Sequence, residues 1–326
     1  MTTAVTAATG YLGTQMMLSL IDAGADPLGL HSEGAPVVAL SGARSAGLAA
    51  DDASALTAAF RDHGVDEVVH FAGSGDVGFA VGDPLTEYQD TLVRTLTVMR
   101  AALNAGVARF VFSSTASVYG VPKLIPIKEG TPLRPINPFG AAMGMAERVV
   151  LDSCAAAGVK LATLRYFNVA GADPQLRAGE TGRPRHLIRA AAQIAVGARG
   201  EPLRIYGDDY ETPDGTAIRD FLHVADMADA HLCALDYLRG GGASVVLNCG
   251  YGEGASVAEV VDAFERVTGK ALPTVPAPRR AGDPPQLIAD DAKIRSVLGW
   301  TPRFDDLDLI VRSAVDWEGQ AADAVG

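Results

Sequence analysis

The chain is short of cysteine and of long apolar runs, and each shortage excludes a class of protein. Its 326 residues include three cysteines, Cys154, Cys233 and Cys249, which are widely spaced and form no CxxC pair. Neither a zinc site nor a disulfide framework is therefore expected. No apolar run is long enough to cross a bilayer, and the N-terminus lacks the basic region of a signal peptide. We expect a cytoplasmic protein in a reducing compartment.

Positive charge is also scarce. Lys and Arg together number 27 against 39 Asp and Glu, which gives a net charge of −12. An acidic protein is not attracted to nucleic acid or to an anionic membrane, so the expected partner is a small molecule. The composition, with 48% hydrophobic and 20% charged residues, is that of a globular protein, and the length suits one large domain or two closely joined ones.

The first residues have the pattern of a dinucleotide-binding turn. A short apolar strand at 4–6 leads into AATGYLG at 7–13, and helical apolar spacing follows. The usual pattern has three glycines, of which Gly10 and Gly13 are present and Ala7 replaces the first. Alanine can form the turn if its φ stays negative, although the backbone then approaches a pyrophosphate less freely. The candidate cofactor contacts here are Thr6, Ala7, Thr9, Gly10, Tyr11, Leu12 and Gly13.

Two further apolar runs, 66–73 and 109–120, end in small or polar residues. Strands that alternate with helices predict an α/β fold with a doubly wound parallel sheet. Ligands bind at the carboxyl ends of such strands. We therefore expect further cofactor contacts from Phe71, Ala72, Gly73 and Ser113.

The second expected strand, 27–30, ends at His31 and Ser32. A carboxylate at this position usually bonds the ribose 2′-hydroxyl of NAD, and it would repel a 2′-phosphate. Because His31 and Ser32 would not repel that phosphate, the sequence favours NADP (NADPH) over NAD. The alternative is that His31 is a solvated loop residue.

Longer motifs carry a resemblance to a known family. They are HFAG at 70–73, FVFSSTASVYG at 110–120, LRYFNVAGADP at 164–174, GDDYETPDGTAIRDFLHVADMADAH at 207–231 and RRAGD at 279–283. Over nearly its full length the chain resembles the UDP-galactose/glucose 4-epimerases of the extended short-chain dehydrogenase/reductase family. The resemblance implies a Rossmann cofactor domain over 1–165 plus about 210–250, and a smaller substrate-binding domain over 166–209 plus about 251–326.

The resemblance fails at the proton-transfer pair. The family segment Asn-Pro-Tyr-Gly-x-x-Lys supplies a Tyr acid/base and a Lys that lowers its pKa. This chain reads NPFGAAM at 137–143, so those positions fall on Phe139 and Met143, which carry no ionisable proton. The family's catalytic Ser/Thr falls on Thr115, which keeps a hydroxyl that could act as a relay.

The contacts to cofactor and substrate that the resemblance implies are mostly retained. Arg219 and Arg280 resemble contacts to a sugar-nucleotide diphosphate, whereas a Tyr that closes over the sugar is replaced near Leu287. Tyr166 and Asn168 join the expected cofactor contacts. The expected substrate contacts are Ser74, Thr115, Asn168, Leu187, Arg219, Arg280 and Leu287.

These losses and retentions lead to competing hypotheses. Apolar residues at 139, 143 and 287 favour an atypical NAD(P)H-dependent ketoreductase of a hydrophobic or aromatic ketone in secondary-metabolite (antibiotic) biosynthesis, similar to the polyketide ketoreductases of simocyclinone-type pathways. The retained arginines favour a non-catalytic sugar-nucleotide-binding pseudo-epimerase, or a sugar-nucleotide epimerase with an unrecognised base. The family's dimer interface, to which a helix over 139–156 contributes, implies a possible homodimer.

Overall fold

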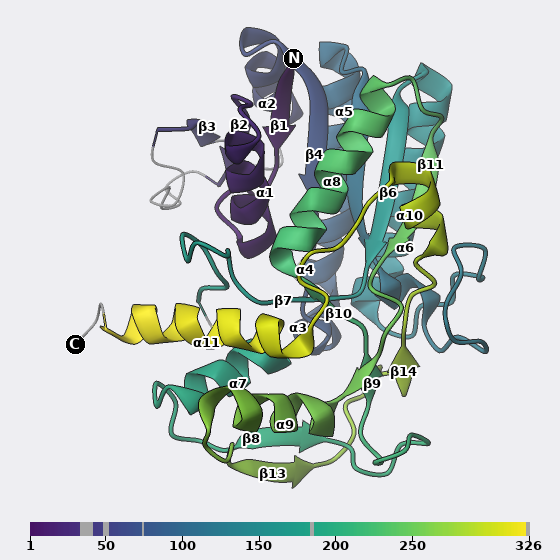
Figure 1. Cartoon of the computed structure of the whole chain (residues 1–326). Coiled ribbons are helices and arrows are strands. Elements are labelled where there is room, and N and C mark those ends of the chain that lie inside the picture. Colours follow the sequence, from purple (N-terminus) through teal and green to yellow (C-terminus); the bar gives the residue numbers. More distant parts are fainter. Residues whose placement is uncertain (33–41, 48–51, 74, 183–185, 324–326) are drawn as a thin grey trace.

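A seven-stranded parallel sheet lies at the centre of the larger part of the molecule in this computed structural model (Figure 1). The structure describes residues 1–32, 42–47, 52–73, 75–182 and 186–323. The strands are β1 (Thr2–Val5), β2 (Leu28–His31), β3 (Arg44–Gly47), β4 (Val65–Phe71), β5 (Arg109–Thr115), β6 (Lys160–Tyr166) and β11 (Val245–Cys249). Their order, β11-β6-β5-β4-β1-β2-β3, reverses between β1 and β4, which is the point where such sheets bind ligands.

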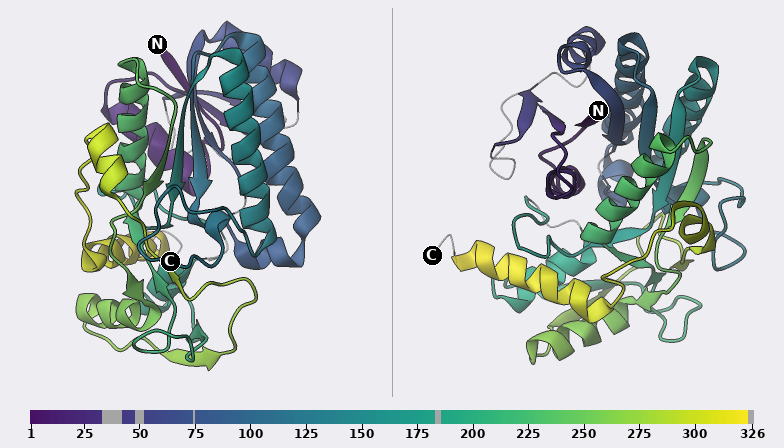
Figure 2. Two further views of the ribbon diagram at one scale, coloured as in Figure 1. Left: turned by 90° about the vertical axis from the view of Figure 1, so that its right-hand side faces the viewer. Right: turned by 45° about the horizontal axis from the view of Figure 1, so that its top comes forward.

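Helices cover both faces of this sheet, as its edge-on view shows (Figure 2). One face packs against α1 (Tyr11–Asp22) and α8 (Val224–Arg239), and the other against α2 (Ala53–Asp62), α5 (Arg94–Ala105) and α6 (Pro138–Ala157). The predicted doubly wound α/β fold is thus confirmed. The connections contain α3 (Val77–Gly82), α4 (Pro84–Tyr88), the π-helical turn η2 (Gln89–Val93), the 3-10 turn η3 (Ala116–Tyr119) and α10 (Ala292–Leu298).

A smaller part lies beyond the carboxyl ends of the central strands (Figure 1). Its strands form short sheets that pair β8 with β13, β7 with β10, and β9 with both β12 and β14. Their bounds are β7 (Asn168–Ala170), β8 (Leu203–Tyr206), β9 (Ile218–Arg219), β10 (Phe221–His223), β12 (Ala255–Ser256), β13 (Thr274–Ala277) and β14 (Gln286–Leu287). Its helices are α7 (Leu187–Ala195), α9 (Val257–Thr268) and α11 (Leu307–Asp323).

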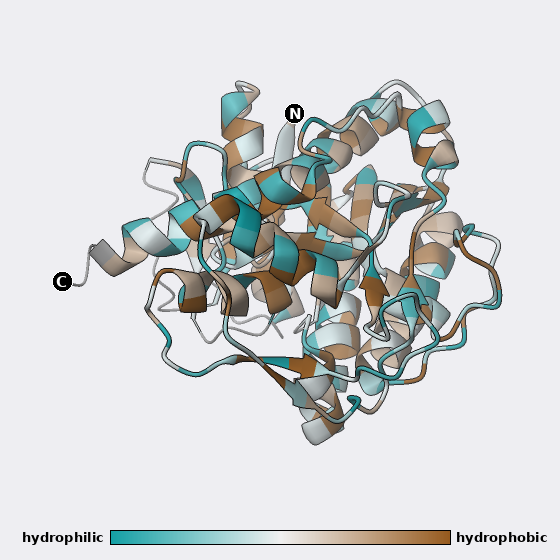
Figure 3. Ribbon diagram, turned by 60° about the horizontal axis from the view of Figure 1, so that its bottom comes forward, coloured by the Kyte–Doolittle hydropathy of each residue, from teal (hydrophilic) through white to brown (hydrophobic). Residues whose placement is uncertain are grey.

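Alternating hydropathy explains how these outer helices attach. Figure 3 shows helices that carry both hydrophobic and hydrophilic turns, as expected of surface helices that bury one side. In α9, Val260, Ala263 and Phe264 are buried, and Ser256 begins the helix with a capping box that includes Glu259. The helix therefore has a defined start and a defined buried face.

Helix α6 brings position 139 to the sheet. The Asn137 side chain accepts a hydrogen bond from the Gly140 amide at 2.8 Å, and Pro138 takes the first helical position. Phe139 and Met143, one turn apart, are both buried in the core cluster between α6 and the sheet. The local sequence thus fixes which side chains this helix presents to the end of β5.

Candidate active site

The dinucleotide turn forms, although not with the conformation expected for Ala7. Its φ is +50°, in the left-handed region that favours glycine, so the prediction of a negative φ is wrong. The turn requires this conformation because the Gly10 amide donates to the Ala7 carbonyl at 2.9 Å. A Cβ on Gly13 would lie 2.1 Å from the same carbonyl oxygen, which explains why glycine is needed there.

The N-terminus of α1 is suited to an anion. Gly10, the residue that precedes the helix, provides no side-chain cap, and the first turn has no acidic residue. The first amides of the helix and its macrodipole therefore point toward the strand-switch position between β1 and β4. This arrangement fits the pyrophosphate of a dinucleotide.

The remaining predicted cofactor residues of this edge lie around the turn. Thr6 lies next to the end of β4, and its hydroxyl accepts a hydrogen bond from the Phe71 amide at 2.9 Å. The Tyr11 hydroxyl donates to the Gly171 carbonyl at 2.7 Å, and burial raises the pKa of Tyr11 well above its usual value, so this phenol is a structural tie between the two parts. His31 ends β2, with Nδ1 2.9 Å from the Ser32 carbonyl oxygen.

Three predicted residues, Ser113, Thr115 and Tyr166, lie on the neighbouring strands β5 and β6 in the centre of the sheet. The Ser113 hydroxyl lies 2.8 Å from Nε2 of His231, and burial lowers the pKa of His231 to about 4, so this ring is neutral. Tyr166 is half-buried at the end of β6, next to Thr115 of β5 in the strand register. Thr115 caps η3 by accepting from the Ser117 amide at 3.2 Å.

The end of β4 is crowded on one side. Gly73 has a φ of +82°, and a Cβ there would lie 2.7 Å from Thr91 Oγ1, 3.0 Å from Phe139 Cε2 and 3.3 Å from Glu87 Oε1. Glycine is thus the residue that allows these three groups to meet at the strand end. The next residue, Ser74, a predicted substrate contact, lies outside the described residues.

Glu87 was not among the predicted site residues. It is fully buried, but the segment 84–93 carries two carboxylates, Glu87 and Asp90, and no pattern in the sequence sets Glu87 apart. Nothing in its spacing indicated that its side chain would meet position 139.

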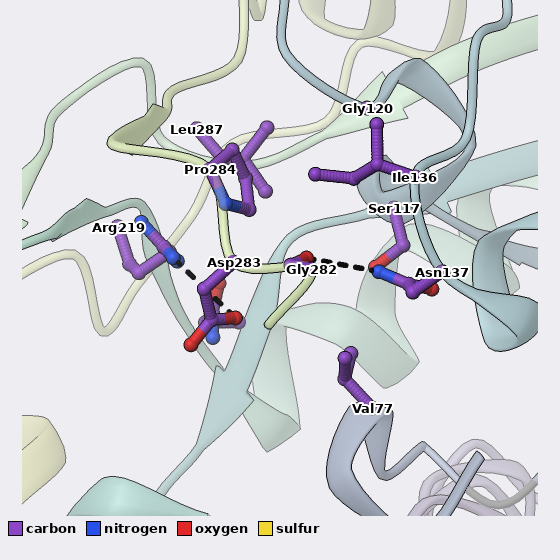
Figure 4. Close-up of a pocket in the computed structure, with 11 residues that line it drawn as sticks. Val77, Ser117, Gly120, Ile136, Asn137, Arg219, Gly282, Asp283, Pro284 and Leu287 are labelled. Atoms are coloured by element: carbon purple, nitrogen blue, oxygen red, sulfur yellow. Dashed lines mark hydrogen bonds and ion pairs between the residues drawn. The ribbon is translucent and has the colours of Figure 1, made fainter. Parts of the chain in front are cut away.

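A small cavity of about 80 Å³ opens between the two parts, where the substrate was expected (Figure 4). Three of the residues that were predicted to contact the substrate, Asn168, Arg219 and Leu287, line it. Leu187 instead packs against the core, and exposed Arg280 stacks over the Tyr206 ring at 3.8 Å. Eight further residues that were not predicted as site residues also line it: Val77, Ser117, Gly120, Ile136, Asn137, Gly282, Asp283 and Pro284.

A nearly buried arginine, Arg219, lines this cavity. Its Nη1 donates to the carbonyls of Ile218 at 2.8 Å and Pro285 at 3.3 Å, and its side chain is only 11% exposed. Burial lowers the pKa of Arg219, and the charge of Asp283 opposes that shift. A buried guanidinium beside an opening is suited to bind a phosphate or another anion.

Comparison with known proteins identifies the family of this chain. A family model described as "NAD dependent epimerase/dehydratase family" matches residues 3–250. The chain belongs to that family. A UDP-glucose 4-epimerase of Azospirillum brasilense is 48% identical to it over 99% of this chain and 93% of its own length.

Solved structures of UDP-glucose 4-epimerases have nearly the same fold as this chain. The UDP-glucose 4-epimerase of Stenotrophomonas maltophila, with bound NAD and formylated UDP-arabinopyranose, has a TM-score of 0.94 at 34% identity and covers 99% of both chains. That of Bifidobacterium longum, in complex with NAD+ and UDP, has a TM-score of 0.93 at 32% identity, also over 99% of both chains.

These findings correct the functional hypothesis. A ketoreductase of aromatic ketones in antibiotic biosynthesis is contradicted, because the curated relatives are named UDP-glucose 4-epimerases. The apolar residues that suggested it have another explanation, since Phe139 and Met143 pack in the protein's own core. The preference for NADP has no support either, because the similar solved structures hold NAD. Across the described residues, no helix has the length and apolarity needed to span a membrane.

Proposed function

We propose that this protein is an NAD-dependent isomerase of a UDP-sugar, which inverts a hydroxyl-bearing carbon of the sugar. The observation that carries the proposal is the pair of anion sites at one edge of the sheet. The uncapped N-terminus of α1 suits the cofactor's pyrophosphate, and the buried Arg219 guanidinium suits the diphosphate of the substrate. The UDP-glucose 4-epimerases that resemble the chain support the same assignment.

NAD is the cofactor we propose, in place of NADP. A bound nicotinamide supplies a hydride acceptor and donor at the strand ends. The chain's own contribution is to hold it, with the turn 7–13 at the pyrophosphate and Phe71 to Gly73 along the cleft. Tighter binding of NADPH than of NADH in a calorimetric titration would contradict the assignment.

The direct test is conversion of UDP-galactose to UDP-glucose by the purified protein with NAD. We expect turnover, together with a higher melting temperature in the presence of NAD and of UDP, because ligands that bind the folded state stabilise it. Absence of both conversion and thermal shifts would contradict the proposal.

A second candidate is a non-catalytic binder of sugar nucleotides. Phe139 and Met143 favour it, because neither side chain has an ionisable proton to exchange at the family's reacting position. Both are also buried, at 7% and 1% exposure. A binder would show the thermal shifts without conversion or NADH formation, so the same experiment separates the two candidates.

We also propose that the cofactor domain comprises 1–165 plus about 210–250, and the substrate-binding domain 166–209 plus about 251–326.

We propose in addition that the protein is a homodimer. Met145 on α6 is 50% exposed, and Leu96 on the neighbouring helix α5 is 44% exposed. Two exposed apolar side chains on adjacent helices suit a helical dimer interface. Light scattering should give twice the chain mass, and Met145→Glu should reduce it.

A further inference from the structure

A buried carboxylate lies next to the end of β4. Glu87 is fully buried, while the adjoining Gly73 is exposed. Oε1 of Glu87 is 3.3 Å from the position where a Gly73 Cβ would be, and the ring edge of Phe139 is 3.0 Å from the same point. The carboxylate therefore adjoins the ring that replaces the family's phenol.

A hydrogen bond fixes this carboxylate. The Thr91 hydroxyl, one helical turn later, donates to Glu87 Oε1 at 2.6 Å. This hydrogen bond holds Oε1 in a defined position beside Gly73. Thr91 belongs to the π-helical turn η2, and such turns occur frequently at functional sites.

Further polar groups hold Thr91 in place. The Thr95 hydroxyl donates to the Thr91 carbonyl at 2.6 Å, and His70 Nε2 lies 3.0 Å from the Thr95 hydroxyl. His70 Nδ1 in turn lies 2.8 Å from the hydroxyl of Thr6, at the start of the dinucleotide turn. Burial lowers the pKa of His70 to about 3, so the ring is neutral and links the two threonines without adding charge. The chain of contacts connects the cofactor turn to the carboxylate.

We propose that Glu87 is the acid–base group of this site, which performs the proton transfer that Phe139 cannot. The inference rests on the proposed UDP-sugar isomerase. The sugar O–H bond breaks and its proton goes to Glu87, while the hydride on the same carbon goes to oxidised NAD and a C=O bond forms. The return step gives the hydride to the opposite face of the carbonyl carbon and the proton back to its oxygen, which inverts that carbon. The sugar is first oxidised while NAD is reduced, and the ketone is then reduced while NADH is reoxidised. No other reactant is consumed.

Other titratable groups near the site are less well placed. The Tyr119 hydroxyl is buried and is engaged by Asn248 at 2.6 Å and by Arg165 at 2.9 Å. His186 pairs with Glu180 at 3.0 Å, and its Nε2 is 3.3 Å from the Gly75 carbonyl oxygen, two residues beyond Gly73. His186 is therefore the competitor that the experiment must exclude.

The test compares Glu87→Gln with the wild type. We expect UDP-sugar conversion to fall on the order of 10²- to 10⁴-fold, as for loss of a positioned acid/base group, with the Kd values for NAD and UDP unchanged. A second readout is infrared: addition of UDP-sugar and NAD should produce a protonated-carboxyl band in the wild type that Glu87→Gln lacks. Adding Phe139→Tyr and Met143→Lys to Glu87→Gln should restore part of the rate.

Control variants separate chemistry from folding. Glu67→Gln also neutralises a fully buried carboxylate, but one near the start of β4, away from Gly73, where it pairs with Arg239. It should lower the melting temperature without lowering the rate. Glu87→Asp keeps the charge but withdraws it by one methylene, and we expect it to fold and to lose at least about tenfold in rate.

The outcomes distinguish this inference from the proposed function. A wild type that binds NAD and UDP but converts no sugar overturns both, and the failure then belongs to the proposed function. An active wild type with undiminished Glu87→Gln and Glu87→Asp overturns the inference alone. Loss of activity in His186→Gln, with Glu87→Gln still active, overturns it in favour of His186.

Discussion

Arg219 and Asp283 face each other across the cavity, with Nη2 of the arginine 3.8 Å from Oδ1 of the aspartate (Figure 4). This separation is longer than a hydrogen bond. The Asp283 carboxylate therefore balances the charge of the buried guanidinium without accepting a hydrogen bond from its Nη2. A diphosphate would complete the set of acceptors. The relationship leads to a prediction about nucleotide affinity.

Arg219→Ala should weaken UDP binding by about 10- to 100-fold, since a hydrogen bond to a charged group contributes about 1.5–3 kcal/mol. Arg219→Lys should recover only part of that loss, because an ammonium lacks the planar fork. Arg279 is the control: like Arg219 it lies beside an aspartate, but it pairs with Asp209 outside the cavity and stacks over Tyr210 at 4.3 Å. Calorimetry should find UDP affinity unchanged in Arg279→Ala; an equal loss there would assign the effect to general charge.

Phe139→Tyr with Met143→Lys should increase NADH formation from UDP-galactose and NAD, because it restores the family's proton-transfer pair. The same change should lower the melting temperature of the apoprotein, since Met143 is only 1% exposed and an ammonium there is desolvated. Absorbance at the NADH band and a thermal melt measure the two effects. No gain in NADH, with UDP affinity intact, would show that the sugar is not held against position 139.

Acid should destabilise the protein before most carboxylates titrate. Burial lowers the pKa of His70 to about 3 and of His223 and His231 to about 4, from about 6.5 in the unfolded chain. The unfolded state therefore binds more protons below pH about 6.5, so stability is complete above that pH and decreases as the pH falls toward 4. Urea midpoints across this window measure the slope.

The slope should be smaller in His70→Gln, which removes one of the three groups. His31→Gln is the control, because that ring is half-exposed at the end of β2. A slope as steep in His70→Gln as in the wild type would assign the acid sensitivity to other groups.

Ala7→Gly should stabilise the fold modestly. The left-handed conformation costs alanine about 1–2 kcal/mol, and the greater freedom of glycine in the unfolded chain offsets about 0.4–1 kcal/mol of the gain. NAD affinity should not fall. In contrast, Gly13→Ala places a Cβ 2.1 Å from the Ala7 carbonyl oxygen and should abolish tight NAD binding. Thermal melts with and without NAD test both; an unperturbed Gly13→Ala would mean that the turn can relax.

The sequence alone determined the class of fold and the position of the cofactor edge. Apolar runs such as 109–115 must be buried on both sides, which requires a parallel sheet covered by helices, and strand ends in such a sheet form the binding edge. Gly13 was identified from the pattern of the dinucleotide turn, and Arg219 from the resemblance of its motif to the epimerase family. Each lies in a long motif whose local geometry depends little on the rest of the chain.

The tertiary structure decided what surrounds position 139. Glu87 and Thr91 come from one helical segment, Gly73 from the end of β4 and Phe139 from α6, so their meeting depends on how three elements pack. Local sequence could not reveal it, because a carboxylate in a short helix is usually solvated. Likewise, the conformation of Ala7 is imposed by the hydrogen bond from Gly10 and the contact with Gly13, which override the preference of alanine for negative φ.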